Sequence, residues 1–433
     1  MINSIQKKIN TNKTIVGIIG LGYVGIPLAR TASKAGFKVI GFDINAKMVS
    51  DLNKGRSHLK HIPHDDIKLM KKNGFKASHD ISLAKECDVL VICVPTPITN
   101  NRDPDLSSII STMDSLQPYL RKGQLLSLES TTWPGTTKEI LLPYIKKSKL
   151  KIGKDFFLVY SPEREDPGNK DFDTNTIPKI LGGISKSCTV VGKDFYSKFI
   201  KKVVTVSSTE TAEMVKLLEN IHRSINIGLV NEMKMVCEAM GIDVFDVIKA
   251  ASTKPFGFTP YYPGPGIGGH CIPIDPFYLT WKAKEFNLNT KFIELAGEIN
   301  AAMPDYVIDK IISSLNKVQK SLKGSRVLLL GLSYKKDIDD TRESPSVIIL
   351  SKLLKNGAKV SYSDPLIPTF PQMRDYKFDL SSIPLTVKNI KKQDIVILLT
   401  DHTAFDYDLI KKNSDILIDT RGVFKSVGNV VRA

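Results

Sequence analysis

The sequence predicts an α/β fold in which two parallel-sheet domains are joined by a central helical segment with one long helix. Strand-like apolar runs alternate with helical stretches over the first 125 residues, and a shorter alternation of the same kind begins at residue 326. Between them, residues 208–240 contain no proline and keep their apolar residues at helical spacing. Strands separated by helices are typical of a parallel sheet covered on both faces.

The length of the chain predicts more than one domain. A chain of 433 residues is too long for a single hydrophobic core. The changes of pattern place an N-terminal α/β domain at 1–206, a central helical domain at 207–305 and a C-terminal α/β domain at 306–433.

The strands of the two α/β domains are expected where apolar runs are bounded by turn residues. In the first domain they fall at 14–19, 38–43, 88–94, 124–129, 155–160 and 202–206, with a helix at 25–35. In the second they fall at 326–330, 359–363, 394–400 and 415–419.

The long central helix has recognisable ends. Ser207 and Glu210 have the spacing of a capping box at its start, and Gly241 fits a C-terminal stop. After it, residues 253–276 are rich in glycine and proline. A turn-rich loop of that length is more than a connector, so we expect it to carry function.

Composition and charge limit the function classes. Apolar residues make up 42% and charged residues 24%, which excludes a disordered chain, a collagen and a multispan membrane protein. The net charge of +16 raises nucleic acid, anionic membrane and phosphorylated small molecules as partners. Because the lysines are spread along the chain without an arginine-rich block or zinc-finger spacing, a lysine-rich surface is favoured over nucleic-acid binding.

Cysteine usage and hydropathy indicate the compartment. The cysteine count of five is odd and includes no CxxC pair, which is typical of a reducing, cytoplasmic protein. No apolar run is long enough to cross a bilayer, so we expect a soluble protein without membrane insertion.

A glycine motif opens the first domain. Gly20, Gly22 and Gly25 form a GxGxxG pattern between a strand and a helix, and Asp43 ends the next strand. This arrangement indicates a Rossmann-like dinucleotide site, with the pyrophosphate at the helix N-terminus and the carboxylate on a ribose 2′-hydroxyl. A carboxylate would repel a 2′-phosphate, so NAD is predicted over NADP.

The turn-rich loop ends in a possible nucleophile. Gly268 and Gly269 precede His270 and Cys271, and Asp275 follows four residues after the cysteine. Two glycines would let a substrate approach the sulfur, and Asp275 has the chemistry to orient water. From these residues alone, a catalytic thiol and a structural one are equally supported.

Other candidate residues are less specific. Lys216 and Asn220 are four residues apart and share one helix face, where they fit either oxyanion stabilisation or an ordinary solvated surface. The strings at 129–131 and 161–165 follow strands, at the edge where open α/β sheets bind ligands. Phosphate contacts are expected from Lys335, Arg342 and Arg421 in the C-terminal domain.

A histidine cluster invites a metal interpretation that we reject. His58, His61 and His64 are regularly spaced, but Pro63 breaks helical geometry and the surroundings are polar. A solvated loop is favoured, and no metal site is predicted.

Nine motifs in order make the sequence resemble the UDP-glucose/GDP-mannose dehydrogenase family over residues 14–425. They are GxGxxG, Cys-Val-Pro-Thr-Pro (93–97), Glu-Ser-Thr (129–131), Ser-Pro-Glu (161–163), Lys-x-x-x-Asn (216–220), Gly-Gly-His-Cys (268–271), Lys-Lys-Asp (335–337), Asp-Thr-Arg-Glu-Ser (340–344) and Asp-Thr-Arg (419–421). Within the family, the strings at 160–169 and 262–276 are most similar to the UDP-N-acetylglucosamine 6-dehydrogenases of bacterial surface-polysaccharide synthesis.

The resemblance implies a four-electron oxidation of a sugar C6 alcohol to a carboxylate with two NAD molecules. It assigns Cys271 as nucleophile, Lys216 and Asn220 as oxyanion stabilisers, Asp275 as the water-orienting carboxylate and Glu163 as general acid/base. Thr131 would lie near the nicotinamide and help to position water.

The resemblance also implies binding residues and an assembly. NAD would contact Gly20, Gly22, Tyr23, Val24, Gly25, Asp43, Thr96, Thr131 and Arg342. The UDP-sugar would contact Glu163, Arg164, Lys216, Asn220, Gly268, Gly269, Lys335 and Arg421. The active site is expected in a cleft between the α/β domains, roofed by the 253–276 loop, and the assembly is expected to be a homodimer through the central helices.

The sequence departs from the UDP-glucose branch in two places. After Glu163, the usual Phe-Leu-x-Glu-Gly run is replaced by Arg-Glu-Asp-Pro-Gly at 164–168. No arginine occurs between Arg223 and Arg326, so the loop arginine of UDP-glucose enzymes is missing, with Lys254 as a possible substitute. Both changes argue against plain UDP-glucose as the substrate. UDP-N-acetylglucosamine is the expected sugar, with UDP-GalNAc, UDP-ManNAc and UDP-glucose as alternatives.

Two more distant functions remain as alternatives. A two-electron NAD-dependent hydroxy-acid dehydrogenase would keep the glycine motif and Lys216 but would not need Cys271. A non-enzymatic, NAD-sensing nucleic-acid binder would instead use the positive charge.

Overall fold

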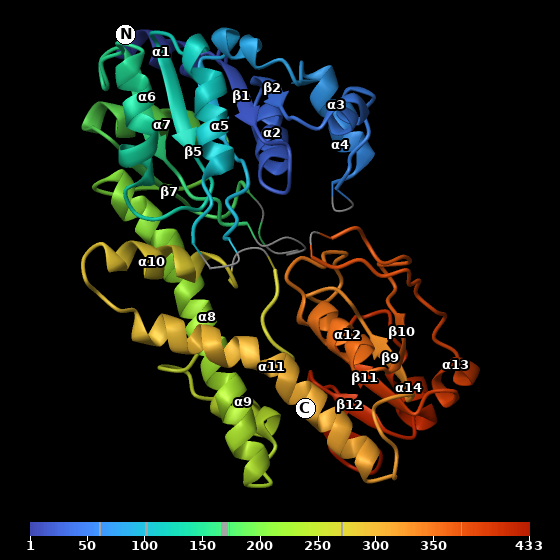
Figure 1. The fold of residues 1–433 in the computed structure, drawn as a ribbon. Coiled ribbons are helices and arrows are strands. Elements are labelled where there is room, and N and C mark those ends of the chain that lie inside the picture. Colours follow the sequence, from blue (N-terminus) through green and yellow to red (C-terminus); the bar gives the residue numbers. More distant parts are fainter. Residues whose placement is uncertain (60–61, 100–102, 166–171, 173, 270–271, 374) are drawn as a thin grey trace. The chain divides into compact units, whose positions relative to one another are not determined.

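The computed structural model describes residues 1–59, 62–99, 103–165, 172, 174–269, 272–373 and 375–433. Backbone contacts divide the chain into two units (Figure 1). The first unit comprises Met1–Glu219 and Phe277–Leu288, and the second comprises Asn220–Pro276 and Asn289–Ala433.

The first unit contains an eight-stranded sheet in the order β3-β2-β1-β4-β5-β6-β7-β8. Its strands are β1 (Ile15–Ile19), β2 (Lys38–Phe42), β3 (Lys76–Ser78), β4 (Val89–Ile92), β5 (Gln124–Leu128), β6 (Phe156–Tyr160), β7 (Lys179–Gly183) and β8 (Val203–Thr205). The order reverses between β1 and β4, which is the switch point of a Rossmann-like fold. The six predicted strands are confirmed, and the short β3 and the buried β7 were not predicted.

The predicted parallel sheet of the first domain is confirmed, and one pair of neighbouring strands in it is antiparallel. β7 runs antiparallel to β6, whereas all other neighbouring strands of this sheet are parallel. A parallel neighbour usually requires a helical crossover. The described parts of the connection, 161–165, 172 and 174–178, contain no helix, and β7 pairs with β6 in the antiparallel direction.

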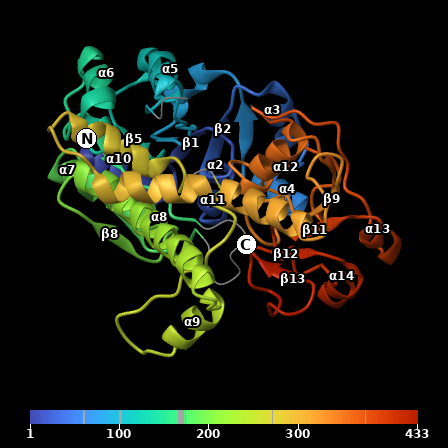
Figure 2. The same ribbon diagram turned by 60° about the horizontal axis from the view of Figure 1, so that its bottom comes forward.

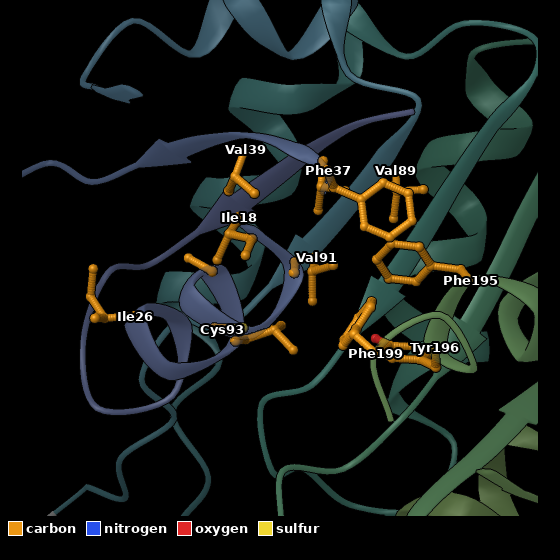
Figure 3. Close-up of a cluster of buried hydrophobic side chains, with 14 of the residues drawn as sticks. Ile18, Ile26, Phe37, Val39, Val89, Val91, Cys93, Phe195, Tyr196 and Phe199 are labelled. Carbon is orange, nitrogen blue, oxygen red and sulfur yellow. The ribbon is translucent and has the colours of Figure 1, made fainter. Parts of the chain in front are cut away.

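Helices cover the first sheet. They are α1 (Ile2–Asn10), α2 (Gly25–Lys34), α3 (Ala46–Asn53), α4 (His64–Lys72), α5 (Ser107–Leu116), α6 (Leu142–Lys147) and α7 (Lys186–Tyr196), with 3-10 turns at Ile81–Glu86 and Gln117–Tyr119 and a π turn at Thr137–Leu141. Figure 3 shows the core on one face, where Phe37, Phe195 and Phe199 pack beside Val89 and Val91. This core fixes the strand ends that carry the predicted site residues.

The second unit contains an all-parallel five-stranded sheet in the order β10-β9-β11-β12-β13. Its strands are β9 (Arg326–Leu330), β10 (Lys359–Ser363), β11 (Ile395–Leu398), β12 (Leu417–Asp419) and β13 (Val430–Arg432). Its helices are α9 (Val244–Ala251), α11 (Lys291–Asn316), α12 (Pro345–Lys355), α13 (Val387–Lys391) and α14 (Tyr407–Asn413), and α10 (Asp275–Lys284) begins in this unit and ends in the first. All four strands predicted for this domain are confirmed, and β13 was missed.

The predicted long helix is α8 (Thr209–Ala239), with 31 residues. Its predicted cap is wrong by one residue, because the backbone N–H of Thr211 donates to Oγ of Ser208, not of Ser207, at 3.1 Å. Gly241 has φ +73°, as a C-terminal stop requires. Figures 1 and 2 show α8 crossing α11, where a Cβ added to Gly228 would lie 3.3 Å from Cα of Ala296.

α8 has an unusual distribution of polar and apolar residues. One face is polar and buried, with Glu213, Lys216, Asn220, Asn231 and Lys234. The opposite face is apolar and exposed, and we call it the α8 stripe: Met214, Leu218, Leu229, Met233, Val236 and, just past the helix end, Met240. A surface helix normally buries its apolar face and exposes its polar face. The buried polar face of α8 therefore suggests a functional site, and the exposed apolar residues suggest an assembly contact.

Within the described part of the chain, no helix combines the length and apolar character that a membrane crossing requires.

Candidate active site

The glycine motif has the geometry of a dinucleotide loop. Gly20 has φ +92° and donates its N–H to Phe42 O at 2.8 Å, so it makes the tight turn after β1. A Cβ on Gly25 would lie 1.8 Å from Gly20 O, so glycine is required for the close approach of α2. A Cβ on Gly22, in contrast, would meet no described atom within 4 Å. The turn is therefore closed at Gly20 and Gly25 and open at Gly22, where a pyrophosphate fits.

Asp43 lies beside this turn. Its carboxylate accepts N–H groups from Leu21 and Asn45, each at 2.9 Å, and the residue stays partly exposed at the end of β2. The loop thus holds the carboxylate in place while leaving it accessible. This is the arrangement expected for the acceptor of a ribose hydroxyl.

The second unit repeats this turn but closes it. Gly331 donates to Ser363 O at 2.9 Å, and Leu332 donates to Asp364 Oδ2 at 2.7 Å, as Gly20 and Leu21 do in the first unit. Asp364 also accepts from two further backbone N–H groups and contacts His402, and it is buried. Its carboxylate has no accessible oxygen for a ribose, so the dinucleotide geometry belongs to the first unit.

Lys216 and Glu163 come together in the first unit. The Lys216 ammonium on α8 lies 3.9 Å from Glu163 Oε2, just after β6, and only 7% and 16% of the two side chains are exposed. Glu163 Oε1 also accepts the N–H of Glu165. The interpretation of Lys216 as part of a solvated helix face is therefore wrong. A buried ammonium beside a carboxylate can stabilise a developing oxyanion and assist proton transfer.

The predicted threonines also meet at the carboxyl edge of the sheet. Thr96 donates from Oγ1 to Thr131 O at 2.8 Å, which joins the segments that follow β4 and β5. Ser130 reinforces the junction by donating to Val94 O at 2.6 Å. A pocket in this unit is lined by Val24 and Leu28 on one side and by Glu129 and 162–165 on another, so the glycine-loop helix and Glu163 share one cavity.

A buried ion pair beneath Glu163 was not predicted. Lys179 Nζ lies 2.9 Å from Glu129 Oε2, and Tyr196 donates to Glu129 Oε1 at 2.7 Å. Lys179 also donates to Pro162 O at 3.5 Å, so this network supports the backbone next to Glu163. Glu129 stood out in the sequence as a strand-end residue, but Lys179 lies 50 residues away on the unpredicted β7 and gave no local signal.

Arg164, a predicted substrate contact, is engaged elsewhere in the structure. Its guanidinium binds Glu219 of α8 at 2.6 and 3.2 Å and donates to Pro178 O at 2.5 Å. The bidentate pair anchors the segment after Glu163 to the helix that carries Lys216. Contact between Arg164 and the sugar remains a prediction.

Asn220 and Asp275 meet in the second unit. Asn220 Nδ2 donates to Asp275 Oδ2 at 2.6 Å, and both residues are buried. This joins the predicted oxyanion donor to the predicted water-orienting carboxylate across 55 residues of sequence. His270 and Cys271 lie outside the described residues. Up to that point the loop packs on the segment after β9: Gly269 donates to Arg342 O at 2.9 Å, and a Cβ on Gly268 would lie 2.5 Å from Cβ of Tyr334.

The described cysteines are poor nucleophiles. Cys87, Cys93, Cys188 and Cys237 are all buried. Burial raises the pKa of the Cys87 thiol to about 12 and raises that of Cys93 well above its usual range. Because the thiolate is the reactive form, these two thiols are inert at neutral pH.

The predicted phosphate contacts follow strands of the second sheet. Lys335 lies in the loop after β9, where its carbonyl accepts from Ser333 Oγ at 2.9 Å. Arg421 follows β12 and donates from Nε to Leu399 O at 2.6 Å. Arg342 pairs with Asp340 at 2.6 Å. Lys335 and Arg421 thus lie at the carboxyl edge of one sheet, and what any of the three binds remains a prediction.

Within the described ranges, no three His, Cys, Asp or Glu side chains are grouped so that they could hold a metal ion. His61 of the histidine cluster lies outside those ranges.

Comparison with known proteins gives matches along nearly the whole chain. Three models of the UDP-glucose/GDP-mannose dehydrogenase family match: the NAD binding domain over 14–200, the central domain over 210–302 and the UDP binding domain over 328–426. UDP-N-acetyl-D-mannosamine dehydrogenase of Methanococcus maripaludis (strain C7) is 35% identical, covering 97% of this chain and 96% of the relative. UDP-N-acetyl-D-glucosamine 6-dehydrogenase of Pseudomonas aeruginosa is 33% identical, covering 90% and 91%.

Solved structures agree with these matches. UDP-D-ManNAc dehydrogenase of Pyrococcus horikoshii superposes with a TM-score of 0.86 at 29% identity, covering 96% of this chain and 98% of that one. The UDP-N-acetyl-mannosamine dehydrogenase Cap5O of Staphylococcus aureus gives a TM-score of 0.82 at 31% identity, covering 97% of both chains.

Proposed function

The chain belongs to the UDP-glucose/GDP-mannose dehydrogenase family, and from this membership we propose that it oxidises the C6 hydroxyl of UDP-N-acetylglucosamine to the uronic acid. It is an NAD-dependent oxidoreductase that acts on a CH–OH group. The proposal concerns the sugar, the four-electron course of the reaction and the residues that perform it.

The observation that carries the proposal is the buried polar face of α8. Lys216 and Asn220 lie one turn apart on this face, and each has a carboxylate partner, Glu163 and Asp275 respectively. Burying a charged lysine destabilises the folded state, so a buried lysine beside a carboxylate indicates a functional role for the charge. Beside a thiolate nucleophile and a hydride acceptor, one cation and one amide donor can stabilise the oxyanion of a covalent intermediate, and two carboxylates can accept a proton and orient water.

The reaction follows from these groups. The glycine loop and Asp43 would hold NAD, which would supply the hydride acceptor for both oxidations. Glu163 takes the hydroxyl proton. The Cys271 thiolate then adds to the aldehyde carbon, and Lys216 and Asn220 stabilise the resulting oxyanion. The second oxidation leaves a thioester, which a water molecule oriented by Asp275 and Thr131 hydrolyses. One alcohol, two NAD and one water give one carboxylate, two NADH and three protons.

The N-acetyl sugar is supported by two features. The run at 164–168 and the missing arginine between Arg223 and Arg326 depart from the UDP-glucose branch, and the relatives described above are named for N-acetyl sugars. Since several of those names specify UDP-N-acetylmannosamine, that sugar is the second candidate. UDP-GalNAc and UDP-glucose follow, and the uronic acid is proposed to feed surface-polysaccharide synthesis.

The identity of the sugar can be tested by measuring NADH production with a panel of UDP-GlcNAc, UDP-ManNAc, UDP-GalNAc and UDP-glucose. The proposal expects the highest kcat/KM with UDP-GlcNAc and at least tenfold less with UDP-glucose, because about 1.4 kcal/mol of lost contact gives that factor. A preference for UDP-ManNAc would reassign the sugar and keep the chemistry. Turnover of a simple hydroxy acid with no UDP-sugar turnover would contradict the proposal.

The proposed assembly is a homodimer in which the α8 stripe packs against a second copy. Its members are 39–68% exposed and lie on one side of α8, two near its start and four toward its end, whereas the buried polar residues lie on the other side. If two copies pack through this stripe, the exposed apolar surface of both copies is removed from water. The proposed compartment is the cytoplasm, since the four described cysteines are free thiols.

Leu229→Asp tests the dimer, because a carboxylate at the centre of the stripe would have to be buried without a partner. Light scattering at micromolar concentration should report a dimer for the wild type and a monomer for the variant. Lys249→Asp, at an exposed site on α9, should leave the mass unchanged. A monomeric wild type, or a dimer that persists in Leu229→Asp, would refute this interface.

A further inference from the structure

Gly264 of the turn-rich loop is bound to α8 through both of its backbone polar groups. The Gly264 N–H donates to Asn231 Oδ1 at 3.0 Å, and Lys234 Nζ donates to the Gly264 carbonyl at 3.2 Å. Pro263 and Pro265 have no N–H, so Gly264 offers the one backbone donor of this tripeptide. Asn231 and Lys234 lie about one turn apart on α8 and bind both polar groups of this residue.

The two α8 side chains are themselves fixed and buried. Asn231 donates from Nδ2 to Asn300 Oδ1 on α11 at 2.9 Å, and Asn300 donates to Ser224 O on α8 at 3.1 Å. Asn231 is fully buried and Lys234 is 3% exposed. Because Asn300 orients the Asn231 amide, its oxygen is the group directed to the loop.

Gly264 also touches a predicted substrate contact. A Cβ added to it would lie 2.9 Å from Nη1 of Arg421, so the guanidinium packs directly against this residue. Arg421 is held from another direction by Leu399 O. The position of Gly264 therefore determines how the loop meets Arg421, and five residues further on the loop reaches Gly269 and then Cys271.

Burial of the Lys234 ammonium at this position costs folding stability. No described carboxylate lies within 4 Å of its ammonium, which lies 5.2 Å from the ring centre of Tyr306. Burial lowers its pKa to about 7; Arg421 and Lys310 lower it as well, and Glu238 and Asp419 raise it. An apolar side chain of similar length would avoid this cost. The hydrogen bond to the loop and the contact with the Tyr306 ring offset part of this cost.

We propose that Asn231 and Lys234 are positioning residues that hold Gly264 and thereby set the loop carrying Cys271, together with Arg421, in the reactive arrangement. The inference rests on the proposed function, in which Cys271 is the nucleophile. Both residues lie on the same buried face of α8 as Lys216, and Lys234 lies 18 residues, or five helical turns, beyond it. They act through the loop and not on the sugar.

The main test is a pair of variants, Lys234→Met and Asn231→Ala, with Lys249→Met on the exposed surface of α9 as control. We expect kcat to fall about 10²-fold in each of the pair, the scale of a small misplacement of reacting groups, with little change in KM for NAD. Hydrogen exchange of the peptide 262–269 should speed up in Asn231→Ala, because Gly264 N–H loses its acceptor. The control should match the wild type in both measurements.

Stability provides a second readout. Between pH 7 and 10.5 the unfolded lysine binds a proton that the folded one does not, so the free energy of unfolding of the wild type should rise with pH in that window. Lys234→Met should lose this rise and be at least as stable as the wild type at pH 7. Lower activity in a variant that is no less stable is the result expected for a positioning residue.

Wild-type kcat in both variants would overturn the proposal, and so would unchanged exchange of 262–269 in Asn231→Ala. If the wild type itself makes no NADH from any UDP-sugar, the proposed function fails. In that event the exchange measurement still decides whether Asn231 holds the loop.

Discussion

Cys271→Ser should abolish formation of the uronic acid while the chain stays folded. The second oxidation requires a thiohemiacetal, and a serine hydroxyl at neutral pH is too weakly nucleophilic to form its counterpart without a base of its own. No described cysteine can substitute, since all four are buried and burial raises the pKa of Cys87 to about 12. The expected loss is on the order of 10⁴-fold or more, the scale for removal of a covalent nucleophile.

The measurement is the amount of uronic acid formed per enzyme, by mass spectrometry, beside a thermal unfolding curve. Cys237→Ser is the matched control: it removes a buried thiol of the second unit and should reduce stability slightly while leaving turnover intact. Normal uronic acid production by Cys271→Ser would refute the thioester route and leave Asp275 without its proposed role.

The second large effect is expected for Lys216→Met. Its ammonium lies 3.9 Å from Oε2 of Glu163, and only 7% of the lysine side chain is exposed. Loss of an oxyanion donor in a buried site costs about 10²–10³-fold in kcat. Methionine keeps the length and packing of the lysine, so the NAD affinity should stay within about threefold.

Lys216→Gln separates charge from hydrogen bonding, because it keeps a donor and loses the cation. If charge stabilisation is the role of Lys216, Gln should be nearly as slow as Met in single-turnover measurements. A variant of either kind with kcat within threefold of the wild type would show that Lys216 serves the fold and not the reaction.

Local patterns predicted the strands and the cofactor loop well. β1, β2 and β9 begin and end within one residue of the predicted ranges, because each is a short apolar run bounded by charged or glycine residues. Gly20, Gly22 and Gly25 could be assigned separate roles because each role follows from the absence of a side chain. Contacts of this kind are encoded within a few residues of sequence.

Long-range polar contacts could not be predicted in the same way. Lys179 and Glu129, or Lys234 and Gly264, meet only because strands and helices bring them together. α8 was the hardest element, because its polar residues resemble a solvated face and its apolar residues resemble a buried one. The structure buries Lys216 and Asn220 and leaves apolar residues such as Leu218 exposed. This burial distinguishes Lys216 and Asn220 from an ordinary helix surface.

The central claim is a four-electron oxidation at one carbon, and the ratio of NADH to uronic acid tests it most directly. With limiting UDP-N-acetylglucosamine, or whichever sugar of the panel reacts fastest, the proposed reaction predicts two NADH for each sugar consumed and no accumulated aldehyde. One NADH for each sugar, with an aldehyde or ketone as the final product, would contradict it.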